Sequence, residues 1–467
     1  MPLTILSDSD VRVLLQSLTK QDILDLQQSL ADALHYYSTS TEDNSNGCCS
    51  SYQPLRTALK RSDGQTTLFM PASSNDGLGV KIVTLSESTE AYAEAAATSS
   101  FDSLSLSTSS TPSASSSTAF DIPPDIPPSI ASKESTSPKG SLTLLDKSGS
   151  PRALVNAEEI TAFRTALAST ILFKKRTNVH DLVVFGAGKQ AYWHIRIALL
   201  LRGPEIHHLN IINRSFDNAH NLIEKLYNPS AKPLSFPTLG ILTAETTDLA
   251  RPKISIITSS HTEYARLLKS AIRSSSVIFC TTPSLTPLFP ASYLTSTEGR
   301  KKGRYIAAIG SYKPHMVELH PDILRQAVAP QHGNHHHKHA RQGGAVVVDS
   351  VEACLKEAGE IIQAGLGGRE VVEIGELLML KRDAERRRME DEGRLELDGS
   401  GVELGSGKKV KGGDGKHHES DSGLGEWLQR GNVIYKSVGL GLMDVVVGGD
   451  LVRLADERGI GTRIENF

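Results

Sequence analysis

A glycine-rich turn between an apolar run and a helical run is the first feature of the sequence that could carry chemistry. In LVVFGAGKQAYWHI, Gly186, Gly188 and Ala191 match the pattern G-x-G-x-x-A, with Gln190 in the same turn. The first glycine permits a tight turn, the second lets the backbone approach a pyrophosphate, and the small third residue lets the helix pack closely on the strand. The helix N-terminus then faces the phosphates. These four residues are therefore predicted to bind a dinucleotide.

The end of the next apolar run predicts which dinucleotide this is. LNIINRS ends at Asn213, Arg214 and Ser215, where an NAD site would place an Asp or Glu on the ribose 2′-hydroxyl. A neutral side chain beside a guanidinium suits a 2′-phosphate, because Arg binds it bidentately and no carboxylate repels it. NADP(H) is therefore preferred, NAD(H) remains possible, and the alternative is that Arg214 is only a solvated charge. Thr281 and Thr282, which follow another buried run, are predicted to lie over the cofactor.

The elements that must position these residues follow from the spacing of apolar residues. Between residues 181 and 386, short apolar runs alternate with helical spacing, which predicts parallel β-α units and a Rossmann domain. Near the N-terminus, a strand over Leu3–Leu6 and a helix capped by Ser7 are expected, with further strands between Thr66 and Leu85. The fold class is α/β.

Three segments depart from this pattern and are predicted to be disordered insertions. Residues 86–140 are rich in Ser, Thr, Ala and Pro, residues 332–344 are rich in His, and residues 382–430 are charged and Gly-rich. Such sequences bury too little apolar surface to offset the entropy of ordering the chain. The tract HHHKH at 335–339 has no rigid element to fix metal geometry, so no metal site is expected.

Composition restricts the function classes. The chain has 467 residues and a formal net charge of -3, which provides no basic field for nucleic acid or an anionic membrane. Its four cysteines show no metal-type spacing, which favours a reducing compartment. No stretch approaches the ~18 apolar residues that would span a bilayer. We expect a soluble, cytoplasmic protein.

An ordered set of motifs resembles the ornithine cyclodeaminase/mu-crystallin family, which includes alanine dehydrogenases and ketimine reductases. The motifs run in family order and cover the chain outside its three insertions. They are MPA at Met70, GVKIV around Lys81, RTALAST from Arg164, GAGKQA from Gly186, IAAIGSYKPHMVEL from Ile306, VVVDSVEACLKEAGEI from Val346 and IYKSVGLGLMD ending at Asp444.

The resemblance implies a homodimer and an arrangement of domains. A Rossmann domain would be inserted in a mixed α/β domain that binds substrate and forms the dimer. On this basis residues 1–85, 141–165 and 431–467 belong to the substrate-binding and dimerisation domain, and residues 166–381 to the Rossmann domain with its His-rich loop.

The resemblance also implies which residues face the substrate. Arg56 and Arg164 match the family's arginines that hold an α-carboxylate, although the choice among basic residues 56–61 stays open. Lys81 matches the lysine near the reacting carbon–nitrogen centre. A carboxylate favours a bidentate guanidinium, and a desolvated lysine can have its pKa lowered into the range for proton transfer. Without the resemblance, the outward slot of an alternating strand would make Lys81 a solvated lysine.

Tyr312 distinguishes branches of the family. The cyclodeaminase branch shows an Asp two residues before the proline of this motif, and GSYKP at 310–314 has Tyr312 instead. Tyrosine, with a reference pKa of about 10, donates a hydrogen bond and cannot replace a carboxylate base. We therefore assign Tyr312 to the catalytic group and favour the ketimine reductase and alanine dehydrogenase branches. Asp444 either orients a site residue or only marks the C-terminal helix.

The resulting hypothesis is an NAD(P)H-dependent oxidoreductase. It would transfer hydride to or from a carbon–nitrogen double bond bearing a carboxylate, in a cyclic imine or the imine of a 2-oxo acid, so its partner would be a small amino acid or imine. Two alternatives stay open. One is an enzyme that converts ornithine to proline and ammonia, and the other is a non-catalytic NADPH-binding protein.

Overall fold

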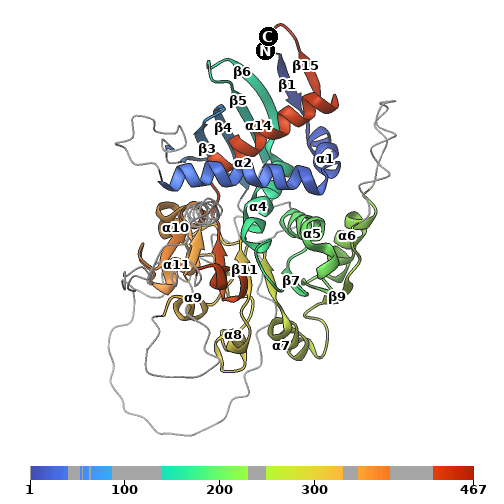
Figure 1. Cartoon of the computed structure of the whole chain (residues 1–467), viewed down its shortest axis with the longest axis vertical. Coiled ribbons are helices and arrows are strands. Elements are labelled where there is room, and N and C mark those ends of the chain that lie inside the picture. Colours follow the sequence, from blue (N-terminus) through green and yellow to red (C-terminus); the bar gives the residue numbers. More distant parts are fainter. Residues whose placement is uncertain are drawn as a thin grey trace, which may run out of the picture.

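Two sheets and the helices between them organise the chain (Figure 1). The computed structural model describes residues 2–39, 53–54, 56–62, 65–86, 139–229, 249–329, 345–378 and 424–467. The His-rich segment 332–344 and most of the predicted insertions 86–140 and 382–430 lie outside the described residues.

The first sheet has seven strands in the described residues and is mostly antiparallel. Its order is β15 (Thr462–Ile464), β1 (Leu3–Leu6), β6 (Pro151–Asn156), β5 (Lys139–Leu145), β4 (Gly77–Ser86), β3 (Gln65–Ser74) and β2 (Thr57–Lys60). Only β1 and β6 pair in parallel. The strand predicted at Leu3–Leu6, the pair between Thr66 and Leu85 and the helix cap at Ser7 are confirmed.

The longest insertion leaves this sheet and returns to it at neighbouring strands. β4 and β5 pair antiparallel, with Thr84 opposite Lys139. The predicted boundaries at 86 and 140 therefore need correction, because Ser86 ends β4 and Lys139 begins β5. Residues 87–138 join the two ends of a hairpin, a place where added length disturbs few contacts.

The second sheet has eight parallel strands in the described residues. Its order is β13 (Val371–Glu373), β12 (Val346–Val348), β14 (Val433–Lys436), β11 (Tyr305–Ala308), β10 (Val277–Cys280), β7 (Asp181–Phe185), β8 (His208–Ile212) and β9 (Lys253–Ile257). The chain runs from β7 outward to β9, then returns to β10 on the other side of β7. This reversal between β7 and β10 is the switch point where such sheets bind dinucleotides.

Two predicted domain boundaries differ from the structure. Residues 431–467 were assigned together to the N-terminal domain, but β14 pairs with β11 and β12 inside the parallel sheet. Its run VIYK is fully buried, as expected of a central parallel strand. The boundary at 165–166 falls within one continuous helix, α4 (Ala157–Phe173), which packs on both β5 and the helix after β7.

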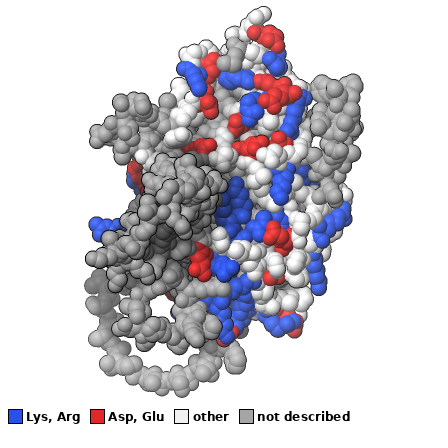
Figure 2. All heavy atoms as spheres, in the orientation of Figure 1, with Lys and Arg blue, Asp and Glu red and all other residues white. Residues whose placement is uncertain are grey.

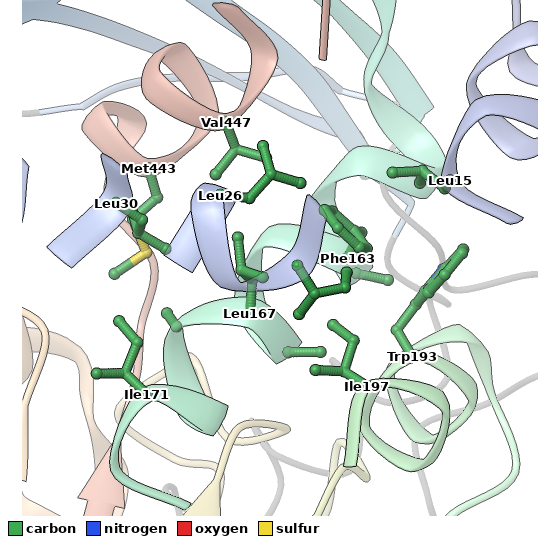
Figure 3. Close-up of a cluster of buried hydrophobic side chains, with 14 of the residues drawn as sticks. Leu15, Leu26, Leu30, Phe163, Leu167, Ile171, Trp193, Ile197, Met443 and Val447 are labelled. Atoms are coloured by element: carbon green, nitrogen blue, oxygen red, sulfur yellow. The ribbon is translucent and has the colours of Figure 1, made fainter. Parts of the chain in front are cut away.

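A helical layer joins the two sheets and contains the main hydrophobic core. It consists of α1 (Asp8–Gln16), α2 (Lys20–Thr39), α4, α5 (Lys189–Arg202) and α14 (Gly441–Arg458). Figure 3 shows their side chains meeting around α4: Leu15, Leu26, Leu30, Phe163, Leu167, Ile171, Trp193, Ile197, Met443 and Val447. Because α4 is buried along nearly its whole length, it holds site residues on a rigid element.

Further helices cover the parallel sheet. They are α6 (Phe216–Tyr227), α7 (Tyr264–Ser274), α8 (Ser292–Thr295), α9 (Pro321–Val328), α10 (Val351–Glu357) and α11 (Gly359–Ala364), with 3-10 turns at Gly203–Glu205 and Gly299–Lys301. In the described parts of the chain, no helix combines the length and apolar character needed to cross a membrane. On the face in Figure 2, Lys and Arg lie beside Asp and Glu.

Candidate active site

A cavity of about 400 Å³ lies between the carboxyl ends of the central parallel strands and the inner face of β3 and β4. Its size is within the range of small-molecule sites. Most residues predicted for cofactor and substrate meet there, although they come from both sheets and from α4. They are Arg56, Lys81, Arg164, Gly186, Gly188, Gln190, Asn213, Arg214, Thr281, Thr282 and Tyr312.

Three predicted residues do not line the cavity. Ala191 is completely buried in α5, where its small side chain allows packing. Ser215 caps α6, because its hydroxyl accepts the backbone N–H of Asn218 at 3.2 Å. Asp444 lies beneath Lys81 and Arg164. These residues support the cavity wall and do not face its interior.

Lys81 is buried and only 2% exposed, so the alternative that it is a solvated strand lysine is wrong. In the register of the sheet it lies between Met70 and Leu142, on the face covered by α14. Its Nζ donates to Asp444 Oδ1 at 2.8 Å. Burial lowers the pKa of Lys81 to about 8; the Asp444 carboxylate opposes this change and the Arg164 guanidinium adds to it. Lys81 can therefore exchange a proton near neutral pH.

Arg164 is held by the same carboxylate. Its Nε donates to Asp444 Oδ1 at 3.2 Å, and Nη1 lies 3.4 Å from the sulfur of Met443. Gly439 makes room for the guanidinium, since a Cβ there would lie 2.7 Å from Nη2, and its φ of +91° also favours glycine. Asp444 thus fixes a lysine and an arginine side by side on the cavity wall. This arrangement can hold a carboxylate next to a proton donor.

Arg56 reaches the cavity from the segment before β2. Its Nε donates to Glu357 Oε1 at 2.9 Å, and a second contact joins the same two side chains. Glu357 ends α10, so this ion pair links the two sheets at the edge of the cavity. Both side chains are about one quarter exposed, which leaves Arg56 open to an exchange of partners.

The glycine-rich turn has the geometry that its sequence predicts. Gly186 has φ +105°, and a Cβ there would lie 2.9 Å from the Thr282 methyl group, so only glycine fits. A Cβ at Gly188 would meet no protein atom within 4 Å, which leaves that backbone open to a ligand. Gly188 also caps α5 without a side chain. Gln190 Oε1 is a buried oxygen without a hydrogen-bond partner among the described residues. The two glycines and the N-terminus of α5 fit a bound pyrophosphate, whereas the Gln190 oxygen accepts only from a donor such as a hydroxyl group.

Sequence reasoning missed several residues of the cavity wall. Lys189, inside the glycine-rich turn, pairs with Glu158 at 2.8 Å and Glu159 at 2.9 Å. Asn218 faces the cavity from the first turn of α6, beside Asn213 and Arg214. Lys189 could have been found from its place in the motif. Asn218 could have been found from its position in the first turn of the helix that follows β8.

The histidine tract predicted not to bind metal lies outside the described residues. Within the described ranges, no group of three or more His, Cys, Asp or Glu side chains has the arrangement of a metal site.

Curated relatives match parts of the sequence, although no protein-family model does. An uncharacterised Saccharomyces cerevisiae protein is 30% identical over 243 residues, which cover 48% of this chain and 59% of that protein. The Delta(1)-pyrroline-2-carboxylate reductase of Bacillus cereus is 25% identical over 68% of this chain and 71% of its own. Mouse (Mus musculus) ketimine reductase mu-crystallin is 26% identical over 51% of this chain and 59% of its own. The matches to the yeast and mouse proteins thus span less than two thirds of those relatives.

Several solved structures share the fold, and two of them illustrate it. The Delta(1)-pyrroline-2-carboxylate reductase of Thermococcus litoralis, in complex with NADH and L-proline, aligns with a TM-score of 0.58 at 19% identity, over 98% of this chain and 99% of that chain. An archaeal alanine dehydrogenase dimer with bound NAD aligns with a TM-score of 0.57 at 16% identity, over both full chains. At these identities the similarity establishes the fold.

Proposed function

The chain belongs to the ornithine cyclodeaminase/mu-crystallin family, and from this premise we propose that it is an NAD(P)H-dependent oxidoreductase acting on carbon–nitrogen bonds. Its substrate would be an imine that carries a carboxylate, such as a cyclic ketimine or the imine of a 2-oxo acid. The relatives named as pyrroline-2-carboxylate and ketimine reductases support this class of reaction.

One observation carries the proposal. A buried lysine with a lowered pKa and a buried arginine share Asp444 on the wall of the cavity that the glycine-rich turn also lines. Burying two cations is costly unless a function or a partner compensates. Here one carboxylate serves both cations, which leaves net positive charge for an anionic substrate.

Each side chain then has a role in the reaction. When bound, the reduced nicotinamide supplies a hydride to the imine carbon. Arg164 holds the substrate carboxylate, and Arg56 can join it by exchanging Glu357 for the substrate. As the carbon–nitrogen π bond breaks, its electron pair moves to nitrogen, which takes a proton from Lys81. Tyr312, which also lines the cavity, donates a hydrogen bond to the substrate. The lysine then regains its proton from solvent.

The preferred cofactor is NADP(H). Asn213 and Arg214 line the cavity, and no carboxylate is found at the strand end where a ribose 2′-hydroxyl would bind. The Asn213 amide donates to the backbone oxygen of Ser215 at 2.8 Å, which fixes the turn that presents Arg214.

The protein forms a homodimer through the outer face of the seven-stranded sheet. The register places Pro71, Val80, Thr143 and Leu154 in one row on the face opposite Lys81; three of the four are apolar, and Leu154 is 41% exposed. An exposed apolar sheet face suits burial against a second copy. The archaeal alanine dehydrogenase with the same fold is a dimer.

The cytoplasm is the proposed location. Cys280 and Cys354 are buried free thiols, which is typical of proteins in reducing compartments.

Turnover with a panel of cyclic imines and 2-oxo acids plus ammonia tests the activity. Net oxidation of NADPH is expected with at least one carboxylate-bearing imine, and Lys81→Met should abolish it while cofactor affinity changes only a few fold. Ammonia release from ornithine without net oxidation would instead identify a cyclodeaminase. Tight NADPH binding without either reaction would indicate a binding protein.

A further inference from the structure

A second group of buried ionisable side chains lies behind the cavity wall, near the carboxyl ends of β10 and β11. Glu318, Glu360 and Lys436 are each at most 1% exposed, and none of them lines the cavity. The reaction proposed above uses none of these groups. Burying two carboxylates and one ammonium group costs free energy unless hydrogen bonds and ion pairs compensate, so the groups that these side chains contact decide how they are stabilised.

The Glu318 side chain bridges two loops. Its Oε1 accepts the backbone N–H of Thr282 at 2.7 Å, in the loop after β10. Its Oε2 accepts the backbone N–H groups of Gly310 at 2.7 Å and Ser311 at 3.3 Å, in the loop after β11. Each carboxylate oxygen therefore holds a different loop. Hydrogen bonds to a charged acceptor are about twice as strong as neutral ones.

These two loops are also the ones that line the cavity next to the glycine-rich turn. A Cβ at Gly310 would lie 2.1 Å from the carbonyl oxygen of Thr282, so the loops are in direct contact. Thr281 and Thr282 in turn contact Gly186. The carboxylate thus holds two neighbouring loops together, of which one adjoins the glycine-rich turn and the other carries Tyr312.

The charges around Glu318 come from three elements. Glu360 on α11 accepts the backbone N–H of Glu318 at 2.8 Å, and Lys436 on β14 lies 3.4 Å from the other Glu360 oxygen. Lys436 also donates to Ser311 Oγ at 2.5 Å, and Cys280 on β10 lies within electrostatic range. Burial raises the pKa of Glu318 to about 7, with Lys436 opposing this and Glu360 adding to it. Glu318 can therefore change charge near neutral pH.

We propose that Glu318 is a positioning residue, which as a carboxylate holds the loops after β10 and β11 at the spacing that catalysis requires. This inference rests on the proposed function, because it assumes that these loops face cofactor and substrate. A protonated carboxyl has only one oxygen that is a pure acceptor, so it cannot hold both loops equally. Catalysis should then decline as the pH falls through about 7.

Glu318→Gln tests this with an almost unchanged shape. The amide keeps one acceptor oxygen and turns an NH2 group toward the N–H of the other loop. We expect kcat at pH 8 to fall at least tenfold, about 1.4 kcal/mol, with the KM for NADPH within threefold. The decline of kcat below pH 7, present in the parent, should be absent in Glu318→Gln. Glu318→Asp keeps the charge with a shorter reach and should retain that decline at a lower rate.

Amide hydrogen exchange supplies a readout that needs no turnover. At pH 8, peptides covering residues 281–284 and 309–312 should exchange about tenfold faster in Glu318→Gln than in the parent. The matched control is Asp456→Asn, which neutralises a partly buried carboxylate paired with Arg152 on the other sheet. The control should change neither these peptides nor the pH profile.

The outcomes separate this inference from the proposed function. If no imine is turned over but the two peptides respond as expected, the positioning role stands and the proposed reaction fails. If turnover is found and Glu318→Gln keeps the decline near pH 7, the positioning role is overturned. Exchange that is unchanged in the two loops, or faster throughout the protein, would overturn it as well.

Discussion

Replacing Asp444 by Asn isolates the effect of one buried charge on the reactivity of Lys81. Asp444 Oδ1 accepts from both Lys81 and Arg164, while Oδ2 is buried without a hydrogen-bond partner among the described residues. An asparagine that turns its NH2 group to the Oδ2 position keeps both hydrogen bonds and removes only the negative charge. The substitution therefore changes electrostatics with little change in packing.

The expected change is a lower pKa for Lys81. Burial and Arg164 both lower this pKa, and only Asp444 raises it. An opposite charge in contact typically changes a pKa by about 1 to 3. Without it, the pKa of Lys81 should fall from about 8 to between about 5 and 7. Because Lys81 must be protonated to act as the acid in imine reduction, the decline of kcat/KM on the alkaline side should move down by the same amount.

Asp444→Asn should also lower the free energy of unfolding, which can be measured without any substrate. Each pKa step costs about 1.36 kcal/mol, so the charged lysine loses about 1.4–4 kcal/mol of stabilisation. This loss of stability is present at pH values at which Lys81 is protonated in the parent, and it decreases as the pH rises above about 8. Urea unfolding of parent and Asp444→Asn should therefore differ more at pH 6 than at pH 9. In a Lys81→Met background the difference should not depend on this titration.

Two results would refute this reasoning. An alkaline decline that stays near pH 8 or moves upward in Asp444→Asn would show that the carboxylate does not sustain the charge of Lys81. A penalty of equal size at pH 6 and pH 9 would show that Asp444 serves packing or Arg164 alone.

Four further predictions concern other parts of the protein. Arg164→Ala should lower kcat/KM for the imine by about 10- to 150-fold through loss of carboxylate pairing, and unchanged steady-state kinetics would contradict its role. In fluorescence titrations the parent should bind NADPH about 10- to 150-fold more tightly than NADH. Arg214→Ala should remove this preference and Asn213→Asp should invert it; equal binding of both cofactors by the parent would contradict the role of Arg214. Replacing residues 87–138 by a short Gly/Ser linker should leave the melting temperature nearly unchanged, because the ends of β4 and β5 are neighbours; a large decrease would show that the segment is structural. Leu154→Lys should produce monomers in sedimentation experiments, and an intact dimer would place the interface elsewhere.

Local features were predictable because their physics lies within a few consecutive residues. The glycine-rich turn needs glycine at φ +105° and an open backbone at its second glycine, and both requirements are visible as residue types. Apolar runs such as VIFC predict buried parallel strands for the same reason. The capping serine at Ser7 also follows from local hydrogen bonding.

Placement across the chain was not predictable from local sequence. The strand of Lys81 alternates between two faces, and its pattern alone does not say which face α14 covers. The partner of Lys81, Asp444, is 363 positions away. Likewise, β14 inserts between β11 and β12 although 124 residues lie between the end of β11 at Ala308 and the start of β14 at Val433.

The sequence by itself determined the fold class and the dinucleotide-type turn, because short-range sterics and apolar periodicity specify them. The basic residues of the site were predicted only through the family resemblance. Only the tertiary structure decided that one carboxylate serves Lys81 and Arg164, and that Glu318 joins two loops behind the cavity wall. The reason is that charge in a protein interior acts through burial and close contact, and both arise when segments distant in sequence pack together.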